Sequence, residues 1–143
     1  MPPTLESRRP RVPHLAELPF YSIYRHGFVR VAVATPCVEI ASPTANVAEM
    51  ARIAREATAS QAILVVFPEL GISAYSNEDL FQQDALLDGS VQALGTLVEA
   101  SKEIGITLAV GMPLRVDDRL FNCAVLLRRG ELLGAVPKSY LPS

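Results

Sequence analysis

The six residues Ala62–Phe67, AILVVF, constrain the fold of this chain more than any other stretch. They form an unbroken apolar run that ends at Pro68, which suits a strand and is far too short to span a bilayer. A half-buried strand alternates apolar and polar residues, and this run does not. We therefore expect a strand of a parallel sheet with both of its faces covered.

Strand and helix patterns alternate around this run. Upstream, Phe28–Pro36 (FVRVAVATP) is rich in β-forming residues and ends at a proline, which predicts the first strand. Between the two strands the apolar period becomes helical, and Ser42 can cap this helix while Pro43 suits its first turn. The predicted apolar face of the helix consists of Val47, Met50, Ala51, Ala54 and Ala57.

A second helix and three more strands are expected downstream. Gly105 can end the helix, since glycine adopts the backbone conformation that closes a helix. Ile106–Leu114 (ITLAVGMPL) predicts a third strand, and Phe121–Lys138 predicts a hairpin that turns at Arg129-Gly130. The order β-α-β-α-β and then β-β predicts an α/β sheet that begins with right-handed crossovers and continues antiparallel. The predicted apolar face of the second helix consists of Leu87, Val91, Leu94 and Val98.

The composition is that of one compact domain. The chain has 143 residues, half of them hydrophobic, and a net charge of −2. It has no run rich in Lys and Arg, so we expect no nucleic-acid partner, and no apolar run long enough for a membrane. Residues 1–19 hold five of the eleven prolines and no apolar signal segment. We interpret them as a Pro-rich N-terminal arm lying on another surface.

The cysteines and histidines predict neither a disulfide framework nor a metal site. Cys37 and Cys123 form no CxxC pair, and Cys123 lies within an apolar strand, where a buried thiol is expected. His14 and His26 lack the spacing of metal ligands. A cytoplasmic location is the plain expectation for such a chain.

Two charged residues follow predicted strands in the same way. Glu69 comes directly after Pro68 at the end of the second strand, and Lys138 comes directly after Pro137 at the end of the last one. Chemistry gathers at the carboxyl ends of strands in such sheets. Either residue taken singly reads as a solvated loop charge. The matched placement predicts that their charged ends lie about 3–5 Å apart, or are bridged by one water.

Several motifs in their order and spacing resemble the nitrilase (carbon–nitrogen hydrolase) superfamily. They are FPELGISAY at 67–75, NEDLFQQDALL at 77–87, GMPL at 111–114 and NCAVLLRRGELLGAVPKSYLP at 122–142. Within that superfamily the chain looks like the glutaminase domain of bacterial glutamine-dependent NAD⁺ synthetases, because FYSIYRHGFVRVAVATP at 20–36 is similar to their opening. The resemblance implies a nitrilase-type α-β-β-α sandwich. Residues 20–143 would hold the N-terminal part of this domain, and the fold would be incomplete.

The resemblance also implies a site. The family uses a Glu–Lys–Cys triad, in which Glu69 matches the general base and Lys138 the lysine, while Tyr75 matches an aromatic position beside the glutamine pocket. The pKa of Glu69 is expected to be raised at a dry strand end. The family's nucleophilic cysteine lies downstream of the lysine, and neither Cys37 nor Cys123 is at its place. We therefore expect this chain to be inactive alone.

The implied function is hydrolysis of L-glutamine to glutamate and ammonia. The ammonia would pass to a separate synthetase domain, which uses ATP and Mg²⁺ to amidate deamido-NAD⁺ to NAD⁺, in a parent that forms a homo-oligomer. No cofactor is expected in this chain. Two alternatives stay open: another nitrilase-type amidase, such as an ω-amidase or a carbamoylase, and a non-catalytic fragment that only binds a partner through its sheet face or its arm.

Overall fold

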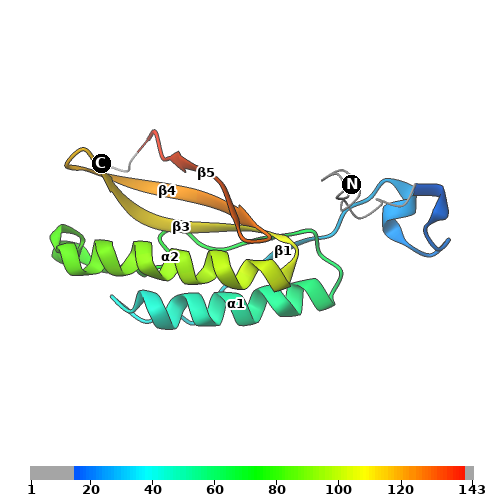
Figure 1. Ribbon diagram of the computed structural model, residues 1–143, viewed down its shortest axis with the longest axis horizontal. Helices are drawn as coiled ribbons and strands as arrows, with labels where there is room; N and C mark the ends of the chain where they lie inside the picture. Colours follow the sequence, from blue (N-terminus) through cyan, green and yellow to red (C-terminus); the bar gives the residue numbers. More distant parts are fainter. Residues whose placement is uncertain (1–14, 141–143) are drawn as a thin grey trace, which may run out of the picture.

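A five-stranded mixed sheet with two long helices forms the protein (Figure 1), whose computed structural model describes residues 15–140. The strands lie side by side in chain order. They are β1 (Val31–Val33), β2 (Leu64–Val66), β3 (Thr107–Val116), β4 (Arg119–Arg128) and β5 (Glu131–Pro137). The helices are α1 (Pro43–Ala59) and α2 (Asp84–Ile104), and 3₁₀ turns are η2 (Leu15–Glu17), η3 (Ile23–His26) and η4 (Glu78–Gln82).

The strand directions match the α/β arrangement predicted from the sequence. β1, β2 and β3 are parallel and are joined by α1 and α2, while β4 and β5 continue the sheet antiparallel. The predicted turn at Arg129-Gly130 is confirmed, and both residues have the positive φ that a tight hairpin of this twist requires. The first strand is shorter than Phe28–Pro36, because only three of its residues pair with β2.

The two helices cover one face of the sheet (Figure 1). The predicted apolar face of α1 is buried, although the side chain of Ser42 at the N-cap position accepts no hydrogen bond from the helix. α2 ends at Gly105, as predicted. Its predicted face is wrong at Val91, which is 52% exposed. Ser90 lies on the buried face instead. Its hydroxyl donates to the Leu86 carbonyl at 2.8 Å, so it needs no hydrogen-bond partner outside the helix.

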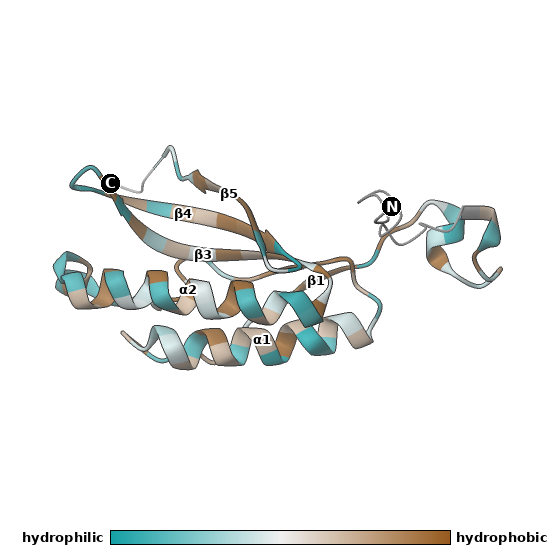
Figure 2. Cartoon of the chain, viewed as in Figure 1, coloured by the Kyte–Doolittle hydropathy of each residue, from teal (hydrophilic) through white to brown (hydrophobic). Residues whose placement is uncertain are grey.

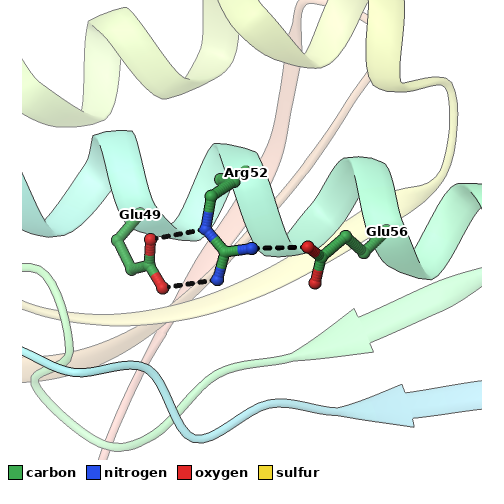
Figure 3. Close-up of polar contacts among 3 residues, drawn as sticks. All are labelled: Glu49, Arg52 and Glu56. Atoms are coloured by element: carbon green, nitrogen blue, oxygen red, sulfur yellow. Dashed lines mark hydrogen bonds and ion pairs between the residues drawn. The ribbon is translucent and has the colours of Figure 1, made fainter.

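The outer side of α1 carries an ion-pair network (Figure 3). The Arg52 guanidinium donates to the carboxylates of Glu49, at 2.7 Å, and Glu56, at 2.5 Å. These contacts raise the pKa of Arg52 and lower that of Glu49. All three side chains lie at the surface, where water screens such pairs and their contribution to stability is small.

The other face of the sheet is open within the described chain. Strand register places apolar side chains from all five strands on this face: Val31, Val33, Leu64, Val66, Ala109, Ala124, Leu126 and Val136. Val33 is 83% exposed and Val136 is 60% exposed. Figure 2 shows that hydrophobic residues are frequent along the strands of the sheet. Both helices pack on the same side, so within residues 15–140 the sheet face that a complete sandwich would cover is open, as expected for an incomplete fold.

Gly111 in β3 allows the segment after β2 to lie directly on the sheet. A Cβ atom at this position would be 2.4 Å from the Leu70 nitrogen and 2.6 Å from the Pro68 oxygen, and both are backbone atoms. The Ile72 N–H donates to the Gly111 carbonyl at 3.0 Å. The glycine and this bond fix where the backbone of Glu69 lies.

We predict that Gly111→Ala destabilises the chain by about 1–3 kcal/mol, because the added methyl group displaces backbone rather than a flexible side chain. Gly95→Ala is the matched control. Gly95 is an exposed residue of α2 with open space around it, so alanine there should stabilise by about 0.5–1 kcal/mol. Urea unfolding of dilute protein, followed by circular dichroism, measures both. Equal effects of the two substitutions would contradict this account of Gly111.

We also predict that the isolated chain binds a hydrophobic dye and self-associates, because apolar side chains from all five strands lie together on the open face. Replacing Val33 and Val136 together by lysine should reduce dye fluorescence with little change in melting temperature, since both side chains are exposed. Fluorescence titration and analytical ultracentrifugation give the measurements. A monomer that melts cooperatively and binds no dye would show that this face is not an interaction surface.

Candidate active site

Glu69 and Lys138 lie at the same edge of the sheet. Two antiparallel steps separate β5 from β3, so β5 runs in the same direction as β2 and its carboxyl end reaches the same edge. Lys138 Nζ donates to Glu69 Oε1 at 2.8 Å, and the two side chains are 36% and 41% exposed. The predicted convergence of these two residues is confirmed, as a direct ion pair.

Asn122 of β4 is a third member of this group. Its Nδ2 donates to Glu69 Oε1 at 2.5 Å, and its carbonyl accepts a bond from the Lys138 N–H at 2.8 Å. Both side-chain donors thus contact the same carboxylate oxygen. Among residues 15–140, Glu69 Oε2 has no hydrogen-bond partner. The sequence analysis did not identify Asn122. The available signal was a polar residue within an otherwise apolar predicted strand.

The bonds to Glu69 set the protonation state of its carboxyl group. The Lys138 ammonium, first, and the Asn122 amide, second, lower the pKa of Glu69 below its usual value, and partial desolvation opposes them only in part. The expectation of a raised pKa is therefore wrong here. Its premise was a dry strand end, whereas the described chain leaves the carboxylate well exposed beside a cation. The group is ionised at neutral pH, as a proton acceptor must be.

Tyr75 shares a cavity with Glu69. This cavity, of about 510 Å³, is lined by Glu69, Leu70, Tyr75, Ser76, Glu78, Phe81 and Asn122. A second cavity of about 340 Å³ starts at Glu69 and Lys138 and continues over the open face past Gly111, Ala124 and Val136. Tyr75 therefore lies beside the same space as Glu69.

Two buried asparagines hold the segment that carries Glu69 and Tyr75. Asn46 of α1 donates from Nδ2 to the Ile72 carbonyl at 3.0 Å, and Asn77 donates to the Ser73 carbonyl at 2.8 Å. The segment forms neither helix nor strand, yet Ile72 and Ser73 are fully buried within it. A polar residue inside the apolar face of α1 was the signal that could have indicated this bracing.

Neither cysteine is hydrogen-bonded to the charged pair among the described residues. Cys123 is buried, and burial raises the pKa of its thiol. Register places it opposite Met112 on the helix-covered face, while Asn122 lies on the open face. Cys37 is exposed, and no bond joins it to Glu69 or Lys138 in the described structure. The buried position expected for Cys123 is confirmed, and the pair has no thiol partner among residues 15–140.

The described part of the chain has neither a metal-binding cluster nor a membrane-spanning helix. It contains no group of three or more His, Cys, Asp or Glu residues that could hold a metal ion. None of its helices is long and apolar enough to cross a membrane.

Two known proteins that are similar in sequence to this chain are a synthetase and an amidase. A glutamine-dependent NAD(+) synthetase of Mycobacterium tuberculosis is 50% identical over 124 residues, which cover 87% of this chain and 18% of that protein. A chloroplastic omega-amidase of Arabidopsis thaliana is 35% identical over 101 residues, which cover 67% of this chain and 27% of that protein. This chain thus spans about a fifth of the synthetase and about a quarter of the amidase.

Solved structures show the same fold. The crystal structure of a glutamine-dependent NAD(+) synthetase from Cytophaga hutchinsonii superposes with a TM-score of 0.73 at 24% identity, over 80% of this chain and 19% of that one. The carbon-nitrogen hydrolase family model matches residues 30–142, which is most of the chain and includes Glu69, Asn122 and Lys138. The chain belongs to the carbon–nitrogen hydrolase family.

Proposed function

We propose that Glu69 and Lys138 are the general base and the lysine of a Glu–Lys–Cys triad in the glutaminase domain of a glutamine-dependent NAD⁺ synthetase. The observation that carries the proposal is the 2.8 Å contact between Lys138 Nζ and Glu69 Oε1, which joins the ends of β2 and β5. The sequence similarity to the mycobacterial synthetase over 87% of the chain supports the choice of glutamine as the substrate.

The triad's thiol would come from outside these 143 residues. In the proposed reaction Glu69 takes the thiol proton, and the thiolate attacks the side-chain carbonyl carbon of glutamine. The Lys138 ammonium stabilises the negative charge on the carbonyl oxygen. The C–N bond then breaks, the proton held by Glu69 passes to the leaving nitrogen, and ammonia departs. Water, activated by Glu69, cleaves the thioester to glutamate and regenerates the thiol.

The remaining roles follow from the same proposal. Tyr75 borders the glutamine, in the cavity that it shares with Glu69. The ammonia serves a separate synthetase domain of a longer, homo-oligomeric protein, where ATP and Mg²⁺ support amidation of deamido-NAD⁺. The remainder of the glutaminase domain would cover the open face of the sheet. Two free cysteines are consistent with a reducing compartment, and we propose the cytoplasm.

A second candidate is a nitrilase-type amidase that releases ammonia without using it. Among such amidases, the 35% identity to the Arabidopsis omega-amidase supports an omega-amidase more than a carbamoylase. It would use the same Glu69 and Lys138. NAD⁺ formation from glutamine by the longer protein separates the two, because only a synthetase couples the ammonia to deamido-NAD⁺. A non-catalytic fragment that only binds a partner would release no ammonia from glutamine, either as the 143-residue chain or within the longer protein.

We predict that the 143-residue chain releases no ammonia from glutamine and that the longer protein does. In the longer protein, Glu69→Gln and Lys138→Ala should each lower kcat at least about 100-fold, since triad members act as a unit. Glu99→Gln and Lys102→Ala are matched controls, because these exposed α2 residues pair with each other far from the site. A coupled dehydrogenase assay measures the ammonia. Turnover by the short chain that is lost in Cys37→Ser or Cys123→Ser would assign the nucleophile to one of those thiols.

The depressed pKa of Glu69 predicts a pH effect on stability. A carboxyl group whose pKa is lower in the folded than in the unfolded state stabilises the fold above its unfolded pKa. This stabilisation is lost as pH falls through the folded pKa. The stability difference between the wild-type chain and Glu69→Gln should therefore be constant above about pH 4.5, the usual Glu value, and shrink below it.

Carbon-13 NMR titration of the Glu69 carboxyl in the same chain measures the pKa directly. It should lie below 4.5 in the wild type and rise in Lys138→Ala, because the ammonium is the largest cause of the shift. A Glu69 that titrates at its ordinary pKa in both proteins would mean that the ion pair does not form in solution.

A further inference from the structure

Asn122 contacts both members of the charged pair by different groups. Its side-chain Nδ2 donates to Glu69 Oε1 at 2.5 Å, and its main-chain carbonyl accepts from the Lys138 N–H at 2.8 Å. It is also the one β4 residue that lines the Tyr75 cavity, and it lines the open-face cavity with Glu69 as well. No other described residue bonds to both.

We propose that Asn122 is a positioning residue that holds the Glu69 carboxylate so that Oε2 alone faces the reacting proton. This inference rests on the proposed function of Glu69 as the general base. A carboxylate held at one oxygen by one donor can still pivot about that contact. Lys138 and Asn122 both bond to Oε1, from β5 and β4, so they fix the plane of the group as well as its place. The oxygen left free is the one that can accept a proton.

The chemistry of the amide suits this task better than a second cation would. Glu69 is an ionised acceptor, so the amide must present its nitrogen and cannot present its oxygen. A neutral donor orients the carboxylate without the larger fall in pKa that another positive charge would cause, and the pKa of Glu69 is already lowered by Lys138. The other charged group at this cavity is Glu78 of η4, which offers Glu69 no donor while ionised.

The scaffold also favours a positioning role. Asn122 lies opposite Pro113 in the long β3–β4 ladder, whose register is regular from Leu108 to Val116. Sites built on strands hold their side chains more closely than sites on loops. The bond to the Lys138 N–H uses only the main chain of Asn122, so a side-chain substitution removes the contact to Glu69 and leaves the end of β5 bonded.

The test is made in the longer protein, with substitutions that change only the side chain of Asn122. Asn122→Ala should lower kcat for glutamine about 10- to 100-fold with a much smaller change in KM, since the carboxylate loses orientation rather than substrate contacts. The acid limb of the kcat/KM profile should move to higher pH, because one of the two donors that lower the pKa of Glu69 is gone. Asn122→Gln, which keeps the amide, should recover part of the rate. Asn122→Asp should be worse than alanine at neutral pH, because two carboxylates would face each other.

Two readouts separate this inference from damage to the fold. NAD⁺ formation from added ammonium does not use the glutaminase site, and it should be unchanged in Asn122→Ala. Leu126→Ala is the matched control: it lies on the same face of β4 and makes no bond to the pair. An equal loss of glutamine turnover in Leu126→Ala, or a parallel change of kcat and KM with no shift of the acid limb, would overturn the positioning role.

A crystal structure of the Asn122→Ala protein tests the positioning role of Asn122 separately from the proposed function of Glu69. If wild-type protein hydrolyses no glutamine, the proposed function is wrong. The positioning role is then judged by the carboxylate itself. A rotated or disordered Glu69 side chain beside an unmoved Lys138 would support it, and an unchanged Glu69 would refute it.

Discussion

The contact between Lys138 and Glu69 is the interaction on which this arrangement depends. The two residues are 69 positions apart in sequence, and each follows a proline that ends its strand. They meet only because two antiparallel turns bring β5 back to the direction of β2. The contact therefore depends on the order and direction of β2, β3, β4 and β5. A slip of one residue in β4 or β5 would turn one partner to the other face of the sheet.

Close packing beneath the pair makes this contact possible. Gly111 has no side chain at the point where the backbone of residues 68–70 crosses β3, and Asn46 and Asn77 bond the turn that follows. The carboxylate is thus fixed by backbone that rests on the sheet, and not by a free loop. This face of the sheet, which lies away from the helices, is apolar and otherwise uncovered within the described residues. The cavity that begins at the pair continues over this face, which is consistent with a site completed by further parts of a carbon–nitrogen hydrolase fold.

Much of this could be predicted from local sequence. Apolar runs, helical spacing and the Arg129-Gly130 turn predicted the element order, and the parallel placement of Glu69 and Lys138 predicted their convergence. Three features depended on tertiary context. The buried face of α2 includes Ser90, because a hydroxyl that is hydrogen-bonded within its own helix can be buried. The spacing of apolar residues does not predict such a position. The AILVVF run is covered on one side only, since apolar residues do not reveal what covers them. The pKa of Glu69 is lowered because Asn122 and Lys138 arrive from strands whose register no local pattern defines. The Pro-rich arm predicted for residues 1–19 lies mostly outside the described residues.

The most direct test of the central claim is a crystal structure of the longer protein with the glutamine-derived thioester trapped at its nucleophile. We expect Lys138 still to contact Glu69 Oε1 and the sulfur to lie within about 3–4 Å of Glu69 Oε2. The substrate carbonyl oxygen should face the Lys138 ammonium. A sulfur on the helix-covered side of the sheet, or a Glu69 that turns away from Lys138 when the acyl group is bound, would contradict the claim.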